Sequence, residues 1–197
     1  MLDGHLRSEL AAVILAGGRG SRLDGRDKPM VAVGGVSMLA RVVRAVLEAG
    51  AGPVVVVGPP REGLPAGVRV VREEPAGGGP VAAAAAGVAD VGENAAYIGI
   101  FAADMPYLSD VAIRVLLDHL HEHDGALFVD EGGRRQLLCG VWRASSLRQA
   151  IARFGETRGG SLRRLVEGLS IGEVRWDGER APYFDCDTEE DLRRVEL

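Results

Sequence analysis

The sequence predicts an α/β protein: a three-layer sandwich in which helices cover both faces of a mostly parallel sheet. Short apolar runs alternate along the chain with longer segments of helical periodicity, which is the pattern of strand–helix units. Most of these runs are apolar at nearly every position, as expected for strands that are buried on both faces. The length of 197 residues fits one such domain. We expect the domain to span residues 11–197, after a disordered N-terminal extension at residues 1–10.

The strands and helices can be assigned in order from these patterns. Strands are expected at residues 12–15, 54–57, 68–71, 97–102, 126–129, 137–142 and 173–176. Helices are expected at residues 37–49, 81–88, 109–121, 147–154 and 161–169, with a last one opening at Thr188. Ser37 and Ser109 stand where an N-cap is needed, and Gly50 ends the first helix. Right-handed crossovers bring the loops after the first and fourth strands to one edge of the sheet, where such folds bind ligands.

Composition and charge argue against several classes of protein. The net charge of −5 is a poor fit to a general nucleic-acid binder, because affinity for phosphates needs a positive surface. No apolar run approaches the roughly 20 residues that span a membrane, and the first residues lack the apolar core of a signal peptide. Cys139 and Cys186 are far apart without a C-x-x-C pair, which suits a reducing cytosol. We therefore expect a cytoplasmic protein with no nucleic-acid or membrane partner.

The chemistry is expected to centre on Ala11–Pro29, AAVILAGGRGSRLDGRDKP, in which a strand opens into a glycine-rich, basic loop. Glycines let the backbone approach an anion with its N–H groups, and the Arg and Lys side chains supply positive charge. Lys28 is the only lysine of the chain, which indicates that this loop needs an ammonium. A Walker A loop is excluded because Pro29 follows Lys28, and the third glycine of a dinucleotide-binding fingerprint is missing.

The same segment resembles the signature L-A-G-G-x-x-x-R-(M/L)-x-G-x-D-K of the molybdenum cofactor guanylyltransferases. The matching residues are Leu15-Ala16-Gly17-Gly18, Arg22, Gly25 and Asp27-Lys28. These enzymes belong to the wider group of nucleotidyltransferases that includes the sugar-nucleotide pyrophosphorylases. The resemblance extends over most of the chain and implies a Rossmann-like, glycosyltransferase-A-like sheet.

Three later segments add to the resemblance. Asp104-Met105-Pro106 is similar to the family's Mg²⁺ motif, and Gly79-Pro80 is similar to the G-P-(L/V)-A segment that lies against the nucleotide base. Glu73 precedes that segment where the family usually has Asp. Phe184–Leu192 is similar to the closing N-x-N-T-P-E-D-L, with Asp187 in place of the second Asn, as is more typical of cytidylyltransferases. Taken alone, these segments also fit a turn aspartate, a helix start and an N-cap.

The resemblance implies that GMP is moved from GTP onto molybdopterin, the molybdenum cofactor, with release of pyrophosphate. The implied catalytic residues are Lys28, Arg22 and Asp104, and Mg²⁺ is held by Asp104 with Asp187 as a second contact. The implied nucleotide-binding residues are Leu15, Ala16, Gly17, Gly18, Lys28, Glu73, Gly79, Pro80 and Asp104. Proteins that deliver or receive the cofactor are further expected partners.

Other functions of the same fold stay open. A molybdenum cofactor cytidylyltransferase or a sugar-phosphate nucleotidyltransferase is one alternative, and a non-catalytic GTP-binding protein is another of a different class. The presence of Lys28, Asp104 and Asp187 together favours an enzyme, because a pure binder has less need of metal and α-phosphate contacts. The guanylyl form of the opening motif favours guanine, since Gly17 leaves room beside a purine.

Two basic pairs and a histidine cluster remain to be explained. Arg134-Arg135 could reach an anionic second substrate or form a solvated hairpin, and Arg163-Arg164 is expected on a helix surface. The histidines at residues 119, 121 and 123 are expected to be structural, because helix positions i and i+2 face different directions.

Overall fold

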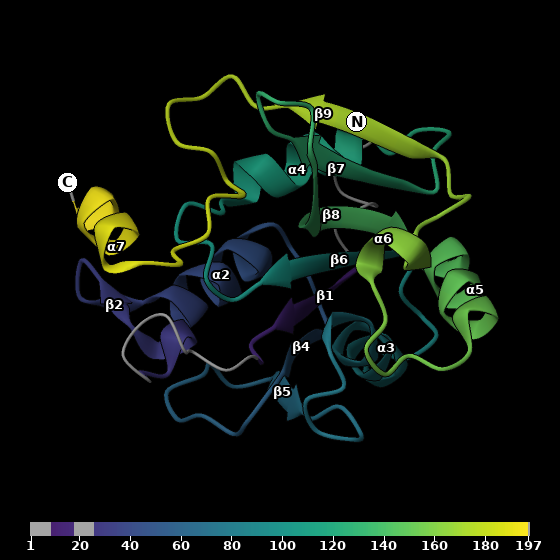
Figure 1. Ribbon diagram of the computed structural model, residues 1–197, viewed down its shortest axis with the longest axis horizontal. Helices are drawn as coiled ribbons and strands as arrows, with labels where there is room; N and C mark the ends of the chain where they lie inside the picture. Colours follow the sequence, from purple (N-terminus) through teal and green to yellow (C-terminus); the bar gives the residue numbers. More distant parts are fainter. Residues whose placement is uncertain (1–8, 18–25, 197) are drawn as a thin grey trace.

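The computed structural model describes residues 9–17 and 26–196, which form a seven-stranded sheet with helices on both faces and a small hairpin (Figure 1). Along the sheet, the strands follow the order β5 (Val68–Val71), β4 (Val54–Val57), β1 (Leu10–Leu15), β6 (Tyr97–Ala102), β8 (Arg135–Arg143), β7 (Gly125–Val129) and β9 (Ile171–Arg175). Neighbouring strands are parallel except at β8, which is antiparallel to both β6 and β7. The predicted mostly parallel α/β sheet is confirmed, and β8 makes it mixed.

The helices form the two outer layers. Figure 1 shows α2 (Met38–Glu48) and α4 (Asp110–Asp118) on one face of the sheet. The other face carries α3 (Pro80–Asp90), α5 (Ala144–Phe154) and α6 (Leu162–Leu165). Successive residues of β1 enter opposite layers: Ala12 and Ile14 pack with α2 and α4, whereas Ala11 and Val13 pack with α3. Burial on both faces explains why this strand has no alternation of polar and apolar residues.

A third, smaller cluster holds the C-terminal helix and was not predicted. Val33 of the hairpin formed by β2 (Ala32–Val33) and β3 (Val36–Ser37) packs in one cluster with Leu192 and Val195 of α7 (Glu189–Glu196). Met38 of α2 and Cys186 complete the cluster. Two-residue strands give no periodicity to detect, and their apolar partners come from the far end of the chain. This cluster brings the chain around Cys186 and α7 beside the hairpin that follows Lys28.

Several element bounds differ from expectation. The strand expected from residue 12 begins at Leu10, which is fully buried although it was assigned to the disordered extension. The helix expected at 109–121 ends at Asp118, and the one expected at 161–169 is a single turn. The predicted N-caps are confirmed: Ser37 Oγ accepts from Ala40 N, and Ser109 Oγ accepts from Ala112 N, both at 3.2 Å. Within residues 9–17 and 26–196, no helix is long and apolar enough to cross a membrane.

Candidate active site

The expected ligand edge of the sheet forms where β1 and β6 end side by side. Leu15 pairs with Ala102 in parallel register, and Ala103 N donates to Leu15 O at 3.0 Å immediately beyond the sheet. The next residue after Ala103 is Asp104, so its carboxylate leaves the sheet close to Ala16 and Gly17. The prediction that the loops after the first and fourth strands share one edge is therefore confirmed.

Lys28 lies between two carboxylates at this edge. It opens the short 3-10 helix η1 (Lys28–Met30), and its ammonium donates to Asp104 and, at 2.7 Å, to Asp187 Oδ1. These contacts join residues that are 76 and 159 positions apart in the sequence. Burial acts to lower the pKa of the Lys28 ammonium, but the two carboxylates outweigh it and raise the pKa above its ordinary value. The ammonium is therefore fully charged near neutral pH.

The C-terminal segment reaches Lys28 because it is fixed to Asp104 and to the start of α7. Cys186 N donates to Asp104 O at 3.2 Å. Thr188 caps α7, since its Oγ1 accepts from Asp191 N while Asp191 Oδ2 accepts from Thr188 N at 2.8 Å. Thr188 rather than Asp187 is thus the cap, and the Asp187 carboxylate contacts Lys28 instead.

The charge and burial around Asp104 fit a divalent cation. Asp104 Oδ1 is buried and accepts no hydrogen bond from the described residues, although a buried carboxylate oxygen normally has a partner. Partial burial and the nearby Asp187 and Asp104 carboxylates raise the pKa of Asp185. Carboxylate oxygens are the ligands that Mg²⁺ and Mn²⁺ prefer. An unpartnered oxygen in a locally acidic surrounding is what such an ion needs.

Several residues that the resemblance assigns to nucleotide binding lie beside Gly17. Glu73 is buried, with 9% of its surface exposed, and its Oε1 accepts from Gly77 N at 3.0 Å. A Cβ added at Gly17 would lie 4.0 Å from the same oxygen, so Glu73 stands beside the glycine-rich segment. Gly79 has a φ of +92°, which favours glycine, and Pro80 is the first residue of α3. The structure therefore brings Gly17, Glu73 and the Gly79-Pro80 turn together.

One residue at this edge was missed by the sequence analysis. Arg61 follows β4, and its side chain is only 5% exposed. It donates to both carboxylate oxygens of Asp27, at 2.7 and 2.8 Å, and to Ala16 O at 2.8 Å. The only signal in the sequence was its place in Gly58-Pro59-Pro60-Arg61, directly after a strand that ends at the ligand edge.

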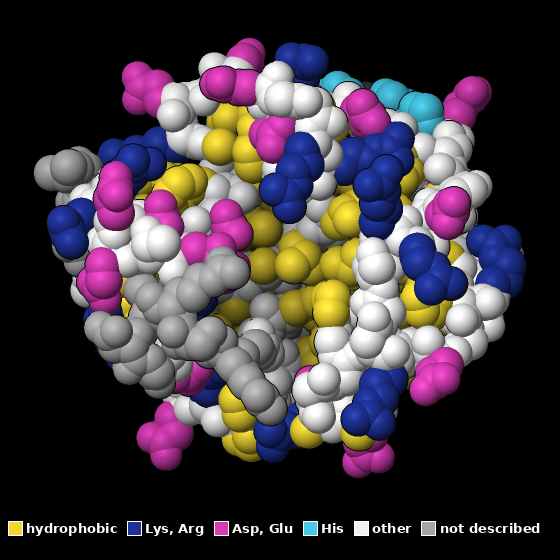
Figure 2. All heavy atoms as spheres, in the orientation of Figure 1, with side chains coloured by type: hydrophobic (Ala, Val, Ile, Leu, Met, Phe, Trp, Pro, Cys, Tyr) yellow, Lys and Arg dark blue, Asp and Glu magenta, His cyan; other side chains and the backbone are white. Residues whose placement is uncertain are grey.

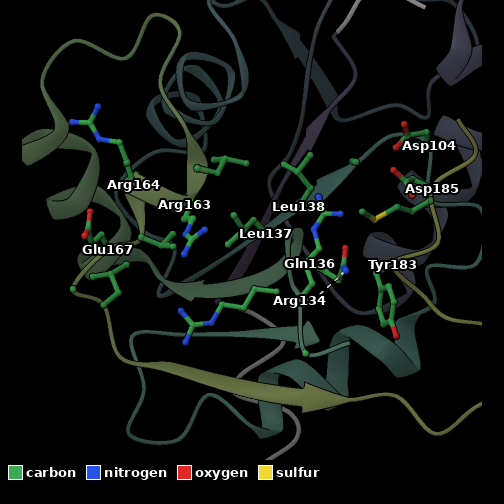
Figure 3. A pocket seen from close by; sticks show the side chains of 18 residues that line it. Asp104, Arg134, Gln136, Leu137, Leu138, Arg163, Arg164, Glu167, Tyr183 and Asp185 are labelled. Atoms are coloured by element: carbon green, nitrogen blue, oxygen red, sulfur yellow. Dashed lines mark hydrogen bonds between the residues drawn. The ribbon is translucent and has the colours of Figure 1, made fainter. Parts of the chain in front are cut away.

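A cavity of about 1130 Å³ opens beside Asp104. It is lined by residues that follow β6, by the β7–β8 hairpin, by α6 with the segment after it, and by Tyr183 and Asp185. Figure 2 shows a hollow with an apolar floor and basic side chains along part of its rim. In Figure 3, Asp104 and Asp185 lie at one end of the cavity, and Arg164 and Glu167 lie at the other.

The four arginines of the two basic pairs all line this cavity, but they differ in their partners. Arg135 pairs with Glu173 at 2.7 Å, and the Arg164 guanidinium lies 5.5 Å from the centre of the Phe154 ring. Among the residues that the structure describes, the guanidinium groups of Arg134 and Arg163 form no ion pair. These two side chains lie between the ends of the cavity in Figure 3. They are therefore available to an anionic ligand.

Some expected residues cannot be placed in this geometry. Gly18 and Arg22 lie outside the described residues. Of the histidine cluster, His119 Nδ1 donates to Val115 O at 2.7 Å, and His123 Nδ1 lies 2.8 Å from Ser170 Oγ. These two rings therefore contact different elements.

A comparison with protein families decides the group to which this site belongs. The family model of the MobA-like NTP transferase domain matches residues 12–174, a range that covers all or most of every strand of the seven-stranded sheet. The chain belongs to this family. Its curated relatives include a probable molybdenum cofactor guanylyltransferase from Mycobacterium avium, 30% identical over 190 residues and 95% of each chain. The molybdenum cofactor guanylyltransferase of Rhodobacter capsulatus is 31% identical over 195 residues, also covering 95% of each chain.

Solved structures share the fold of this MobA-like NTP transferase. A Methanothermobacter nucleotidyl transferase superposes with a TM-score of 0.75 at 22% identity, covering 95% of this chain and 96% of that one. The 2-C-methyl-D-erythritol 4-phosphate cytidylyltransferase of Thermus thermophilus gives 0.69 at 19% identity, covering 95% and 97%. Rv0371c of Mycobacterium tuberculosis in complex with manganese gives 0.68 at 19% identity, also covering 95% and 97%.

Proposed function

We propose that this protein is a molybdenum cofactor guanylyltransferase, which transfers GMP from GTP to molybdopterin and releases pyrophosphate. The observation that carries the reaction type is the Lys28 ammonium held between Asp104 and Asp187 at the sheet edge. The choice of GTP and molybdopterin is supported by the names of the relatives at 30% and 31% identity. It is also supported by the guanylyl form of the segment Leu15–Gly18.

In the proposed reaction, an oxygen of the acceptor's phosphate attacks the α-phosphorus of GTP. The new P–O bond forms as the bond from the α-phosphorus to the bridging oxygen breaks, and pyrophosphate leaves. Lys28 neutralises the charge that develops on the α-phosphate, because its ammonium already stands at this edge of the sheet beside Asp104. The glycine-rich backbone binds the triphosphate and holds it in line with the acceptor.

Mg²⁺ is the metal that we propose for this site, with Asp104 and Asp187 as its ligands. The buried, unpartnered Oδ1 of Asp104 supports this choice, and so does the fold shared with a manganese-bound structure. When bound, the ion supplies positive charge to the phosphate oxygens and orients them. Asp187 reaches the same point from the segment before α7.

The two substrates would occupy opposite sides of Asp104. Glu73 and the Gly79-Pro80 turn would face the guanine base, next to Gly17. The cavity on the other side is large enough for a pterin, and it combines an apolar floor with Arg134 and Arg163. We assign these two guanidinium groups to the acceptor's phosphate, since planar guanidinium groups match phosphate oxygens well.

A pyrophosphate-release assay with each of the four nucleoside triphosphates, with and without molybdopterin, tests this function. We expect release with GTP only when molybdopterin is present. The kcat/KM for GTP should exceed that for CTP by about 10²-fold or more, because a site built for guanine leaves polar groups unpaired around another base. A preference for CTP would make the protein a cytidylyltransferase. Binding of GTP without release under any condition would instead support a non-catalytic binder.

A further inference from the structure

Arg61 is a buried cation that the proposed reaction does not use. Its guanidinium is charged at any ordinary pH, so a side chain only 5% exposed needs strong partners. Three hydrogen bonds meet part of this need: Nε and Nη2 donate to the two oxygens of Asp27, and Nη2 also donates to Ala16 O. Nη1 is buried and has no hydrogen-bond partner among the described residues. This fork-to-fork geometry fixes the direction as well as the distance of the Asp27 carboxylate.

The two partners of Arg61 stand at the two ends of the glycine-rich segment. Ala16 follows β1 directly, and Asp27 is the residue before Lys28. Asp27 also sets the backbone of η1, because Met30 N donates to Asp27 O at 2.8 Å. Its side chain makes no capping bond to that helix, since Arg61 holds it. One guanidinium therefore joins the exit of β1 to the entry of the helix that carries the lysine.

The backbone around Arg61 leaves room for this contact. A Cβ added at Gly58 would lie 2.8 Å from Ala16 O and 3.2 Å from Arg61 Nη1. Real Cβ atoms do not come that close to a backbone oxygen, so the close approach depends on glycine. Gly58 N in turn donates to Val71 O at 2.9 Å, which ties the Arg61 loop to the sheet. The backbone between β4 and Arg61 is thus tied to β5, whereas the Arg61 guanidinium bonds to Ala16 and Asp27.

The Arg61–Asp27 contact is not needed to hold the sheet together. Asp27 is 49% exposed, and the edge itself is closed by Ala16 N donating to Val57 O and Ala103 N donating to Leu15 O. The Arg61 hydrogen bond to Asp27 is the largest cause of a lowered pKa at that carboxyl, so the contact is specific and charged. What the contact adds is a fixed separation between Ala16 and Lys28.

We propose that Arg61 is a positioning residue for nucleotidyl transfer, which sets the place of Lys28 by joining Ala16 to Asp27. This inference rests on the proposed function only for the role of Lys28 at the α-phosphate. A displacement of about 1 Å in a catalytic group can cost about 10²-fold in rate, so loss of Arg61 should affect kcat more than nucleotide affinity.

The test uses Arg61→Met and Asp27→Asn, singly and together, with Arg69→Met as the matched control. Arg69 makes the corresponding Nε–Oδ2 contact with Asp90, at 2.7 Å, but its side chain is exposed on β5. We expect kcat of pyrophosphate release to fall by roughly 10–100-fold in each single variant, while the dissociation constant for GTP changes by less than about 5-fold. The double variant should be no worse than Arg61→Met, because both changes break one contact. Arg69→Met should behave as wild type.

A second readout does not depend on activity. Because Lys28 is the only lysine, protein labelled with ¹⁵N,¹³C-lysine gives a single side-chain signal in NMR spectra. We expect this signal to shift in Arg61→Met and in Asp27→Asn, and to stay unchanged in Arg69→Met. Should Arg61→Met fail to fold, Asp27→Asn carries the test, since its carboxylate is half exposed.

Different experimental outcomes would contradict the role of Arg61 and the proposed function. Wild-type kcat and an unmoved lysine signal in folded Arg61→Met would overturn the proposal. Loss of GTP affinity at unchanged kcat would also overturn it, because Arg61 would then contact the nucleotide directly. A moved lysine signal in a protein that releases no pyrophosphate from any triphosphate would refute the proposed function while leaving Arg61 as the residue that positions Lys28.

Discussion

Replacing Lys28 by methionine removes the ammonium that bridges Asp104 and Asp187, and the cost can be worked from their exposure. The side chains are 16%, 21% and 43% exposed, so the contacts lie between those of a buried and a surface ion pair. Removing one partner costs about 3–5 kcal/mol in a buried pair and about 0–1 kcal/mol at the surface. We expect a loss of about 2 kcal/mol, which lowers the Tm by about 4–8 °C in a chain of this length.

Thermal unfolding followed by circular dichroism in EDTA near neutral pH measures this loss. The pH is chosen from the raised pKa of Lys28: the stabilisation is fully present below its ordinary value of 10.5 and disappears only as the pH rises through the raised one. Arg44→Met is the control, since Arg44 forms an exposed pair with Glu48 at 3.9 Å and should contribute less than about 0.5 kcal/mol. Turnover of Lys28→Met should also fall by roughly 10²–10³-fold.

A double variant separates the ion pair from a general loss of packing. Lys28→Met combined with Asp104→Asn removes a carboxylate that would otherwise stay unneutralised, so the Tm should recover by more than half of the loss. Unfolding of Lys28→Met at the wild-type Tm in EDTA would refute the argument. So would a double variant that is less stable than Lys28→Met alone.

Three other predictions concern the metal, the pH dependence and the packing of the edge. Asp104→Asn should weaken Mn²⁺ binding, measured by electron paramagnetic resonance, by roughly 10-fold or more, because a neutral amide is a poor ligand for a hard cation; an unchanged titration would leave Asp104 as a turn residue. Asp124 accepts from Ser146 Oγ and Ser170 N, which lowers its pKa. Asp124→Asn should therefore cost about 1–2 kcal/mol at pH 7, with the difference vanishing as the pH falls below about 4, and a constant difference across this range would contradict the assignment. Gly58→Ala should lower stability by about 1–3 kcal/mol in urea unfolding, since the added Cβ meets a backbone oxygen, and an unchanged midpoint would show that the loop yields freely.

Much of the fold follows from local patterns in the sequence, and the exceptions have a physical reason. The strands at 54–57, 68–71 and 97–102 occur at the predicted bounds, because each is a mostly apolar run with polar or turn residues at or near its ends. The β2–β3 hairpin was missed because its strands have two residues each and are stabilised by α7 from the far end of the chain. Local patterns do not contain such partners.

The residues of the candidate site also include some that short motifs predict and others that they do not. Lys28 and Asp104 could be predicted to share one edge of the sheet, because the motif that contains each of them begins where a strand ends. The parallel register of β1 and β6 brings these two strand ends together. Arg61 could not be predicted, because its partners Ala16 and Asp27 lie 45 and 34 positions away. The cavity could not be predicted either, since Arg163 lines it because of the way α6 packs and not because of any sequence pattern around Arg163.

The reversed strand β8 divides the sheet into two parts that can vary separately. On one side, β5, β4, β1 and β6 run parallel, and they are followed respectively by the Glu73 loop, the Arg61 loop, the glycine-rich segment and Asp104. On the other side, β7 and β8 are antiparallel, so a short turn joins them without a crossover helix and places Arg134 at the same edge. Under the proposed function, donor and acceptor recognition are then encoded in separate stretches that meet only at Asp104. A chimera that exchanges the β7–β8 turn with that of a relative should therefore alter the choice of acceptor while the nucleotide preference is retained, and the same modular layout gives evolution a route to new acceptors on one nucleotide-binding scaffold.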